Sequence, residues 1–131
     1  MGVREEATKL HESGFNCAQS VLGSCNKNFN LDEKSALALS AGFGGGLRCG
    51  EICGAVSGGV MALGLAYPFN DAKDLTAKDK IAALAKAYTS AFQEKYGCLR
   101  CEELKGDKSK CPAYIEYAAE LAETMITKER D

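Results

Sequence analysis

The sequence predicts an all-α protein, a compact single-domain bundle of five to six helices with a glycine-rich helix buried at its centre. Hydrophobic residues make up 46% of the 131 residues, which is enough for one packed core. Only two prolines occur, and this leaves room for long helices. Apolar residues recur three and four positions apart, and no segment alternates as strands do. Without a linker or repeat, residues 1–131 are expected to form a single helical, cysteine-rich domain.

The first third of the chain predicts three helices. Residues 2–13 carry an amphipathic pattern. Asn16 is expected to cap a second helix that ends near Cys25. Asp32 is a favourable cap for a third helix that ends near Gly42. The residues expected on one apolar face of this third helix are Leu37, Ala38 and Ala41.

The predicted central helix covers the stretch 51–67, which carries no charge after Glu51. A membrane-spanning helix needs about 20 apolar residues, and this stretch is shorter and rich in glycine. Its apolar character all round predicts a helix packed on every side. The glycine run at 42–46 before it matches neither phosphate-binding glycine pattern. We therefore expect this run to bend the backbone sharply and to pack close to the cysteines.

The second half of the chain predicts two long helices. Thr76 is expected to cap the first of them, and Gly97 to end it. Its predicted apolar stripe consists of Ile81, Leu84, Ala85, Tyr88 and Phe92. After a short helical turn and a lysine-rich loop, Pro112 occupies the first position of the last helix. The residues that this helix is expected to bury are Ile115, Ala118, Ala119, Leu121 and Met125.

Four of the seven cysteines fall at predicted helix N-termini, and these are the candidate catalytic residues: Cys53, Cys17, Cys101 and Cys111. Unpaired backbone N–H groups at a helix start favour the thiolate over the thiol. We therefore expect lowered thiol pKa values and thiols that are reactive or ready to bind metal. The structural alternative is that these small side chains fill core positions near helix ends.

The other three cysteines give weaker indications of a functional site. Cys98 forms a C-x-x-C pair with Cys101, but the βαβ setting of thioredoxin-like motifs is absent. Cys49 lies four residues before Cys53, so these pairs are compatible with a four-thiolate metal site that includes Cys49 and Cys98. Cys25 is expected to be ordinary helix-end packing. The single histidine, His11, is expected on a helix surface, which gives a Cys–His pair little support.

Charge and the first residues limit the partners and the location. The net charge of −2 offers no basic surface for nucleic acid or for an acidic membrane. The segment MGVREEATKL lacks the apolar stretch of a secretory signal, so a cytoplasmic, reducing location is expected. No membrane insertion is expected. The redox partner is unknown, and a homodimer is left open.

Four segments of the chain resemble the C_GCAxxG_C_C family of redox-active proteins: FNCAQSVL, GFGGGLRCGEICGAVSGGVMALG, CEELKG and CPAYIEYAAE. The resemblance spans nearly the whole chain. It implies that the family's four cysteines correspond to Cys17, Cys53, Cys101 and Cys111. The family name writes Gly-Cys-Ala where this chain has Cys53-Gly54-Ala55. The cysteine pattern is also similar to the iron–sulfur part of split-Soret cytochromes, which favours a metal cluster, although covalent haem is not expected.

These observations leave three hypotheses. The first is a thiol-based redox protein in which Cys53 is the central sulfur and another of the four cysteines resolves a mixed disulfide. The second is an iron–sulfur or zinc protein with the same four thiolates as metal ligands. The third is a structural or interaction module with buried cysteines. Whether the protein is an enzyme, such as a thiol oxidoreductase, is left open.

Overall fold

The structure is a computed structural model that describes residues 2–26, 29, 31–104 and 110–130, the last three by their backbone alone. Within these ranges it has seven α-helices, of which α6 is a single turn, so the predicted number of five to six is close. The helices are α1 (Val3–Glu12), α2 (Cys17–Cys25), α3 (Glu33–Ser40), α4 (Gly54–Ala66), α5 (Leu75–Tyr96), α6 (Cys101–Leu104) and α7 (Cys111–Arg130). The described ranges contain no strand beyond one isolated bridge. The all-α prediction is confirmed.

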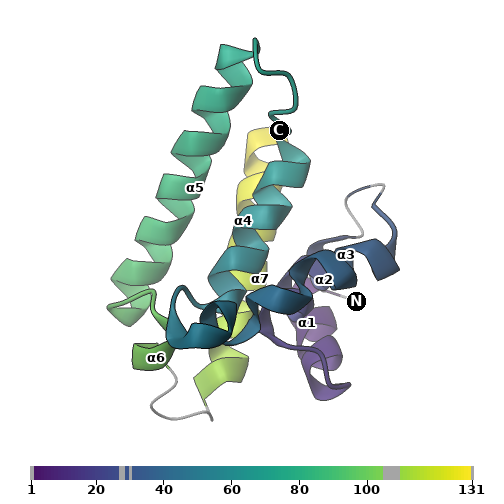
Figure 1. Cartoon of the computed structure of the whole chain (residues 1–131), viewed down its shortest axis with the longest axis vertical. Coiled ribbons are helices and arrows are strands. Elements are labelled where there is room, and N and C mark those ends of the chain that lie inside the picture. The colour runs from purple at the N-terminus through teal and green to yellow at the C-terminus, as the bar shows by residue number, and fades with distance from the viewer. Residues whose placement is uncertain (1, 27–28, 30, 105–109, 131) are drawn as a thin grey trace.

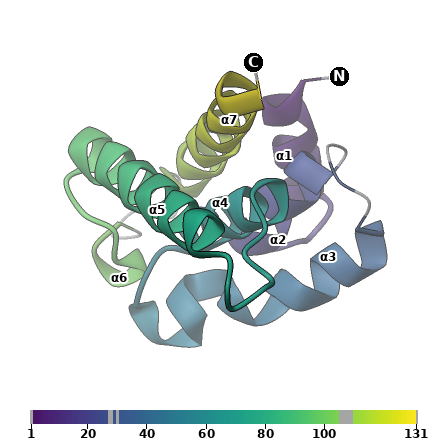
Figure 2. The ribbon, with the colours of Figure 1, turned by 90° about the horizontal axis from the view of Figure 1, so that it is seen from above.

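The glycine-rich helix α4 is the centre of the bundle, as predicted. It packs against α2, α5 and α7, and Figures 1 and 2 show it enclosed by these three helices. Its side chains are small enough for the neighbouring helices to approach closely. The fully enclosed members of α4 are Gly54, Ala55, Val56, Gly58, Gly59, Ala62 and Leu63. The helix begins at Gly54 rather than near Glu51 because the residues before it pair with another segment.

The predicted caps of α2 and α3 are confirmed, and that of α5 is corrected. Asn16 accepts a hydrogen bond from the Gln19 backbone (3.0 Å), and the Gln19 side chain accepts one in return. This reciprocal pair is a capping box. Asp32 caps α3. The prediction that Thr76 caps α5 is wrong, because Asp74 accepts from the Ala77 backbone N–H (3.0 Å) and starts the helix earlier.

The predicted apolar face of α3 is wrong. Ala36 and Ser40 are buried, whereas Ala38 is exposed and Leu37 is half-buried. The helix packs against α2 through its small side chains. Ser40 can be buried because its hydroxyl donates to the Ala36 carbonyl (2.8 Å), which satisfies the polar group inside the protein.

The two long helices bury most of the predicted residues. In α5 the buried residues are Leu84, Tyr88 and Phe92, and the other two members of the stripe are half-buried. In α7 the predicted Leu121 and Met125 are also only half-buried. The α7 residues that are buried are Tyr114, Ile115, Ala118, Ala119, Ala122 and Ile126. The buried residues of α7 therefore differ from the predicted ones: Tyr114, Ala122 and Ile126 are added, and Leu121 and Met125 are not among them.

Candidate functional site

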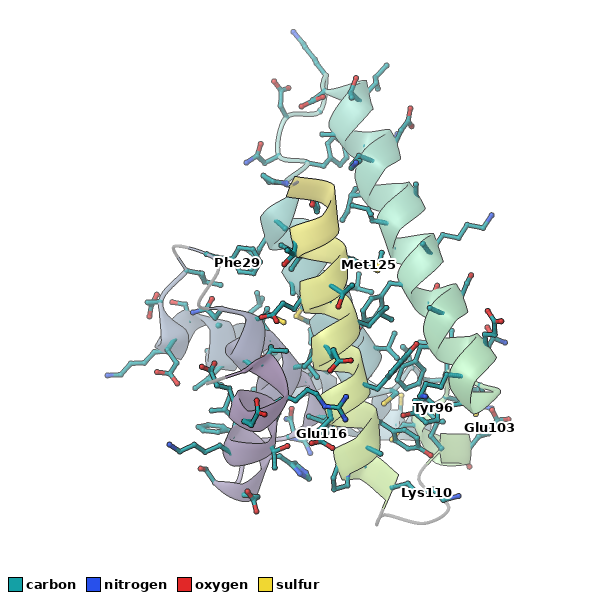
Figure 3. All side chains as sticks on the ribbon, turned by 180° about the vertical axis from the view of Figure 1, so that it is seen from behind. Phe29, Tyr96, Glu103, Lys110, Glu116 and Met125 are labelled. Carbon is teal, nitrogen blue, oxygen red and sulfur yellow. The ribbon has the colours of Figure 1, made fainter. Side chains whose placement is uncertain are left out.

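A pocket of about 320 Å³ lies at the end of the bundle where several helices begin. Its lining residues are His11, Cys17, Gly45, Cys53, Gly54, Cys101, Leu104, Cys111 and Tyr114. The fold therefore brings together all four cysteines at predicted helix starts, although they are far apart in the sequence. Figure 3 shows side-chain sulfur near Tyr96, whose ring packs edge-on against that of Tyr114 (4.7 Å between centroids).

Each of the four cysteines stands at the start of a different helix. Cys17, Cys101 and Cys111 are the first residues of α2, α6 and α7, and Cys53 is the N-cap of α4. Figure 1 shows the starts of α4, α6 and α7 at the same end of the molecule. Their predicted positions at helix N-termini are confirmed.

A short antiparallel bridge places two of the cysteines. Ile52 pairs with Arg100, the Cys53 backbone N–H donates to the Leu99 carbonyl (2.7 Å), and that of Cys101 donates to the Glu51 carbonyl (2.6 Å). Successive side chains in extended backbone point to opposite faces. Ile52 and Arg100 are exposed, so Cys53 and Cys101 share the face that lines the pocket. The sequence analysis did not predict this bridge.

The glycine run bends next to the pocket, as predicted. It forms two short helical turns, Ala41–Phe43 and Gly46–Gly50, and the second contains backbone with non-helical angles. Gly46 has φ +63°, and a Cβ atom there would overlap the backbone of Glu51 and lie 2.8 Å from the Cβ of Cys101. Only glycine fits this position without strain. The close approach holds the segment before α4 against the start of α6.

The thiol of Cys17 is held in its protonated form. Its pKa is raised to about 12, mainly by burial and in part by the neighbouring thiols of Cys53, Cys111 and Cys101, because ionised sulfurs would repel one another. Cys17 is also hydrogen-bonded to the side chain of Cys111. These two sulfurs are therefore direct neighbours.

Cys53 shows two opposing effects. Burial raises its pKa to about 11, while hydrogen bonds from the backbone N–H groups of Ala55 and Val56 lower it. The helix N-terminus thus acts as predicted, but burial outweighs it, since Cys53 is only 4% exposed. The prediction of lowered pKa values is wrong for Cys17 and Cys53. The pocket lining contains no lysine or arginine among the described residues.

The remaining cysteines do not line the pocket. Cys25 is fully buried at the end of α2, and its thiol lies 3.9 Å from the Ala119 carbonyl, as expected for helix-end packing. Cys49 is exposed, and its thiol donates to the Gly46 carbonyl (3.5 Å). Cys98 is half-buried against the core. The C-x-x-C spacing therefore does not produce a paired site in the pocket, and Arg48 is likewise an exposed residue outside it.

His11 is a pocket residue that was not among the predicted site residues. It was expected on a helix surface, with little support for a Cys–His pair, but it is half-buried and lines the pocket with the four cysteines. The signal was present in the sequence: His11 follows the buried Val3 and Ala7 at intervals of four, which places all three on one face of α1. Because histidine is polar, it was expected on the helix surface rather than on this buried face.

The pocket residues do not fit a metal ion as they stand. Among the described residues, no group of three or more His, Cys, Asp or Glu side chains is arranged to hold one. The proposed ligand set of Cys17, Cys53, Cys101 and Cys111, with or without Cys49 and Cys98, has the right donor chemistry for zinc or an iron–sulfur cluster. The metal alternative stays a prediction.

Comparison with known proteins gives one match. A family model described as "Putative redox-active protein (C_GCAxxG_C_C)" matches residues 15–125. No curated protein and no solved structure matches significantly. Among the described residues, none of the helices combines the length and apolarity that crossing a membrane requires.

Proposed function

Since the chain belongs to the C_GCAxxG_C_C family, whose model matches most of its length, we propose that it is a redox protein that works by thiol–disulfide exchange. The observation that carries the proposal is the hydrogen bond between Cys17 and Cys111 inside a pocket that Cys53 and Cys101 also line. Two thiols in direct contact can become a disulfide with little movement of the backbone. We assign Cys17 and Cys111 as the first pair to exchange.

The exchange consumes one disulfide and oxidises one pair of cysteines. A thiolate of the pair attacks one sulfur of an incoming disulfide, the S–S bond breaks, and one thiol leaves with a proton. The second cysteine then attacks the mixed disulfide and releases the other thiol. The substrate disulfide has gained two electrons and two protons, and Cys17 and Cys111 have lost them.

Cys53 and Cys101 form the inner part of the proposed site. Cys53 is the most buried of the four, so an incoming molecule meets Cys17 or Cys111 more readily. Cys53 and Cys101 lie diagonally across the bridge, where Cα atoms of regular strands are roughly 7–8 Å apart. This separation exceeds the usual disulfide range, so a Cys53–Cys101 bond requires the backbone to move. Cys53, which the sequence suggested as the central sulfur, here acts second: its thiolate attacks the Cys17–Cys111 bond, forms a disulfide with one of these two cysteines and releases the other as a thiol.

The test is to oxidise the reduced protein with oxidised glutathione without oxygen, and to map disulfides by peptide mass spectrometry. We expect a Cys17–Cys111 bond to form first, and both Cys17→Ser and Cys111→Ser to abolish it. Cys49→Ser is the matched control, because Cys49 is outside the pocket and should leave the bond unaffected.

Two results would contradict the proposal. One is an oxidised protein in which Cys98 and Cys101 pair while Cys17 and Cys111 stay reduced. The other is stoichiometric zinc or iron in the anaerobically purified protein that is lost in Cys17→Ser and protects the thiols from glutathione. That second result would support the metal-binding alternative.

A further inference from the structure

The only histidine of the chain lines the same pocket as the four cysteines, and we infer that His11 accepts the proton of the reacting thiol. This inference rests on the proposed function, because it assigns the base that thiol–disulfide exchange requires. It adds an imidazole base to a site for which the sequence predicted cysteine residues only.

A base is needed because burial holds the thiols of Cys17 and Cys53 in their protonated form. Burial raises the pKa of Cys17 to about 12 and that of Cys53 to about 11. The nucleophile in disulfide exchange is the thiolate, and such thiols supply very little of it at neutral pH. A neighbouring group that takes the proton as the sulfur attacks removes this obstacle.

His11 is the lining residue with suitable chemistry. A neutral imidazole ring carries one nitrogen with a lone pair, and this nitrogen can accept a proton. Tyr114 lines the pocket too, but its hydroxyl donates to the Leu104 carbonyl (3.0 Å) and is buried. The lining residues that the structure describes include no aspartate, glutamate or lysine.

The position of His11 favours the outer pair of cysteines. It lies in the last turn of α1, and α1 packs against α2 and α7, the helices that begin with Cys17 and Cys111. Its helical neighbours Val3 and Ala7 are buried on the same face, which directs His11 toward the interior rather than toward solvent.

Ion pairs join α1 to α7. From α7, Glu120 accepts from Arg4 (2.9 Å), and Glu116 lies 4.0 Å from Arg4 and accepts from Thr8 (3.3 Å). Figure 3 shows Glu116 on the side of α7 that faces α1. From α2, the pocket group is Cys17, and α2 has no acidic residue in its first turn. The groups facing His11 within the pocket are therefore the thiols and the Tyr114 hydroxyl.

With His11 as the base, every proton that moves in the exchange is accounted for. His11 takes the proton of the attacking thiol and becomes an imidazolium ion. The thiolate forms the mixed disulfide, and the leaving sulfur of the substrate receives the proton from the imidazolium. His11 returns to its neutral form, ready for the second step, and no further co-reactant is required beyond the substrate disulfide.

The experiment measures how fast iodoacetamide alkylates each cysteine across the pH range, resolved by mass spectrometry, in wild type and in His11→Gln. In wild type we expect the base in the pocket to speed the alkylation of Cys17 or Cys111 and to make its rate depend less steeply on pH. In His11→Gln the rate should instead rise steadily with pH, and it should be about 10-fold or more below wild type near neutral pH. Glu12→Gln, an exposed neighbour on α1, is the control and should match wild type.

Chemical rescue separates a proton acceptor from a residue that only packs. In His11→Ala, added imidazole should restore the alkylation rate of the pocket thiols, whereas it should not affect Cys49, which is outside the pocket. Circular dichroism confirms that each variant is folded. An unchanged pH profile in His11→Gln, or no rescue in a folded His11→Ala protein, overturns the inference. Because alkylation needs no disulfide exchange, the assay tests His11 even if the glutathione experiment contradicts the proposed function.

Discussion

At the scale of single residues, Cys53 shows how a helix N-terminus and burial compete for one thiol. Two backbone N–H groups of α4 hydrogen-bond to it and favour the thiolate, yet its pKa is about 11 because the side chain is buried. The sequence could predict the first effect, since it depends on the local position in a helix. It could not predict the second, because burial depends on how α4 packs against the other helices.

The raised pKa values of Cys17 and Cys53 predict that the protein loses stability in alkali. The ordinary thiol value is 9.0, and the folded values are about 12 and about 11. Above pH 9 the unfolded chain releases these two protons while the folded protein retains them. The folded state then binds more protons, so the free energy of unfolding falls as the pH rises through this range, and these groups contribute no slope at lower pH.

Urea unfolding under reducing conditions at about pH 8 and about pH 10 checks this. Lysines and tyrosines also titrate in this range, so the decisive comparison is with a Cys17→Ser/Cys53→Ser variant. The double variant should lose less stability than wild type between the two pH values. Equal losses in the two proteins would show that these thiols are not held in their protonated form.

At the scale of the element, α4 depends on glycine at particular positions. The Tyr88 side chain of α5 reaches across α4, and its hydroxyl donates to the Ala118 carbonyl of α7 (2.8 Å). A Cβ atom at Gly59 would overlap the Tyr88 hydroxyl and ring. Gly59 therefore leaves the space through which one side chain connects three helices.

Gly59→Ala should destabilise the protein by about 2–3 kcal/mol, because Tyr88 must move out of a buried hydrogen bond and a packed position. Gly64→Ala is the matched control on the same helix, since nothing lies within 4 Å of a Cβ atom there. That substitution should stabilise the protein by about 0.5 kcal/mol, because alanine is the better helix former. Denaturant unfolding measures both changes, and equal effects would contradict this role of Tyr88.

Helices were predictable from the sequence, whereas the contacts between them were less so. The N-caps of α2 and α3 and the central position of α4 follow from local patterns, and all three are confirmed. The bridge between Ile52 and Arg100 does not follow from local patterns, because neither segment has the alternation typical of strands. It forms only where the glycine turn brings the two segments together. His11 was missed for a similar reason, as its face is defined only when α1 packs against α2 and α7.

At the scale of the whole molecule, the pocket is where five helices, α1, α2, α4, α6 and α7, meet. The sequence suggested which cysteines would gather, because all four occupy predicted helix starts and the family resemblance implies the same four. It could not suggest that Cys17 and Cys111 are in direct contact, since that depends on how α2 and α7 pack together.

Oxidation should stabilise the whole bundle if Cys17 and Cys111 form a disulfide. The bond closes a loop of roughly a hundred residues, and the loss of chain entropy in the unfolded state predicts a gain of about 4 kcal/mol over the reduced protein. Urea unfolding of the oxidised and reduced forms measures the gain, and Cys111→Ser, treated with the same oxidant, should show none. An oxidised protein less stable than the reduced one would mean that the bond strains the starts of α2 and α7.

The distribution of the four pocket cysteines along the polypeptide has a consequence for biosynthesis. A nascent chain exposes Cys17 and Cys53 well before Cys101 and Cys111 have been translated, so the pair that touches in the folded protein cannot form on a half-made chain. No short fragment of the protein contains all four pocket cysteines either. A bond between Cys17 and Cys111 can therefore form only once translation has passed both codons and α7 has packed against α2.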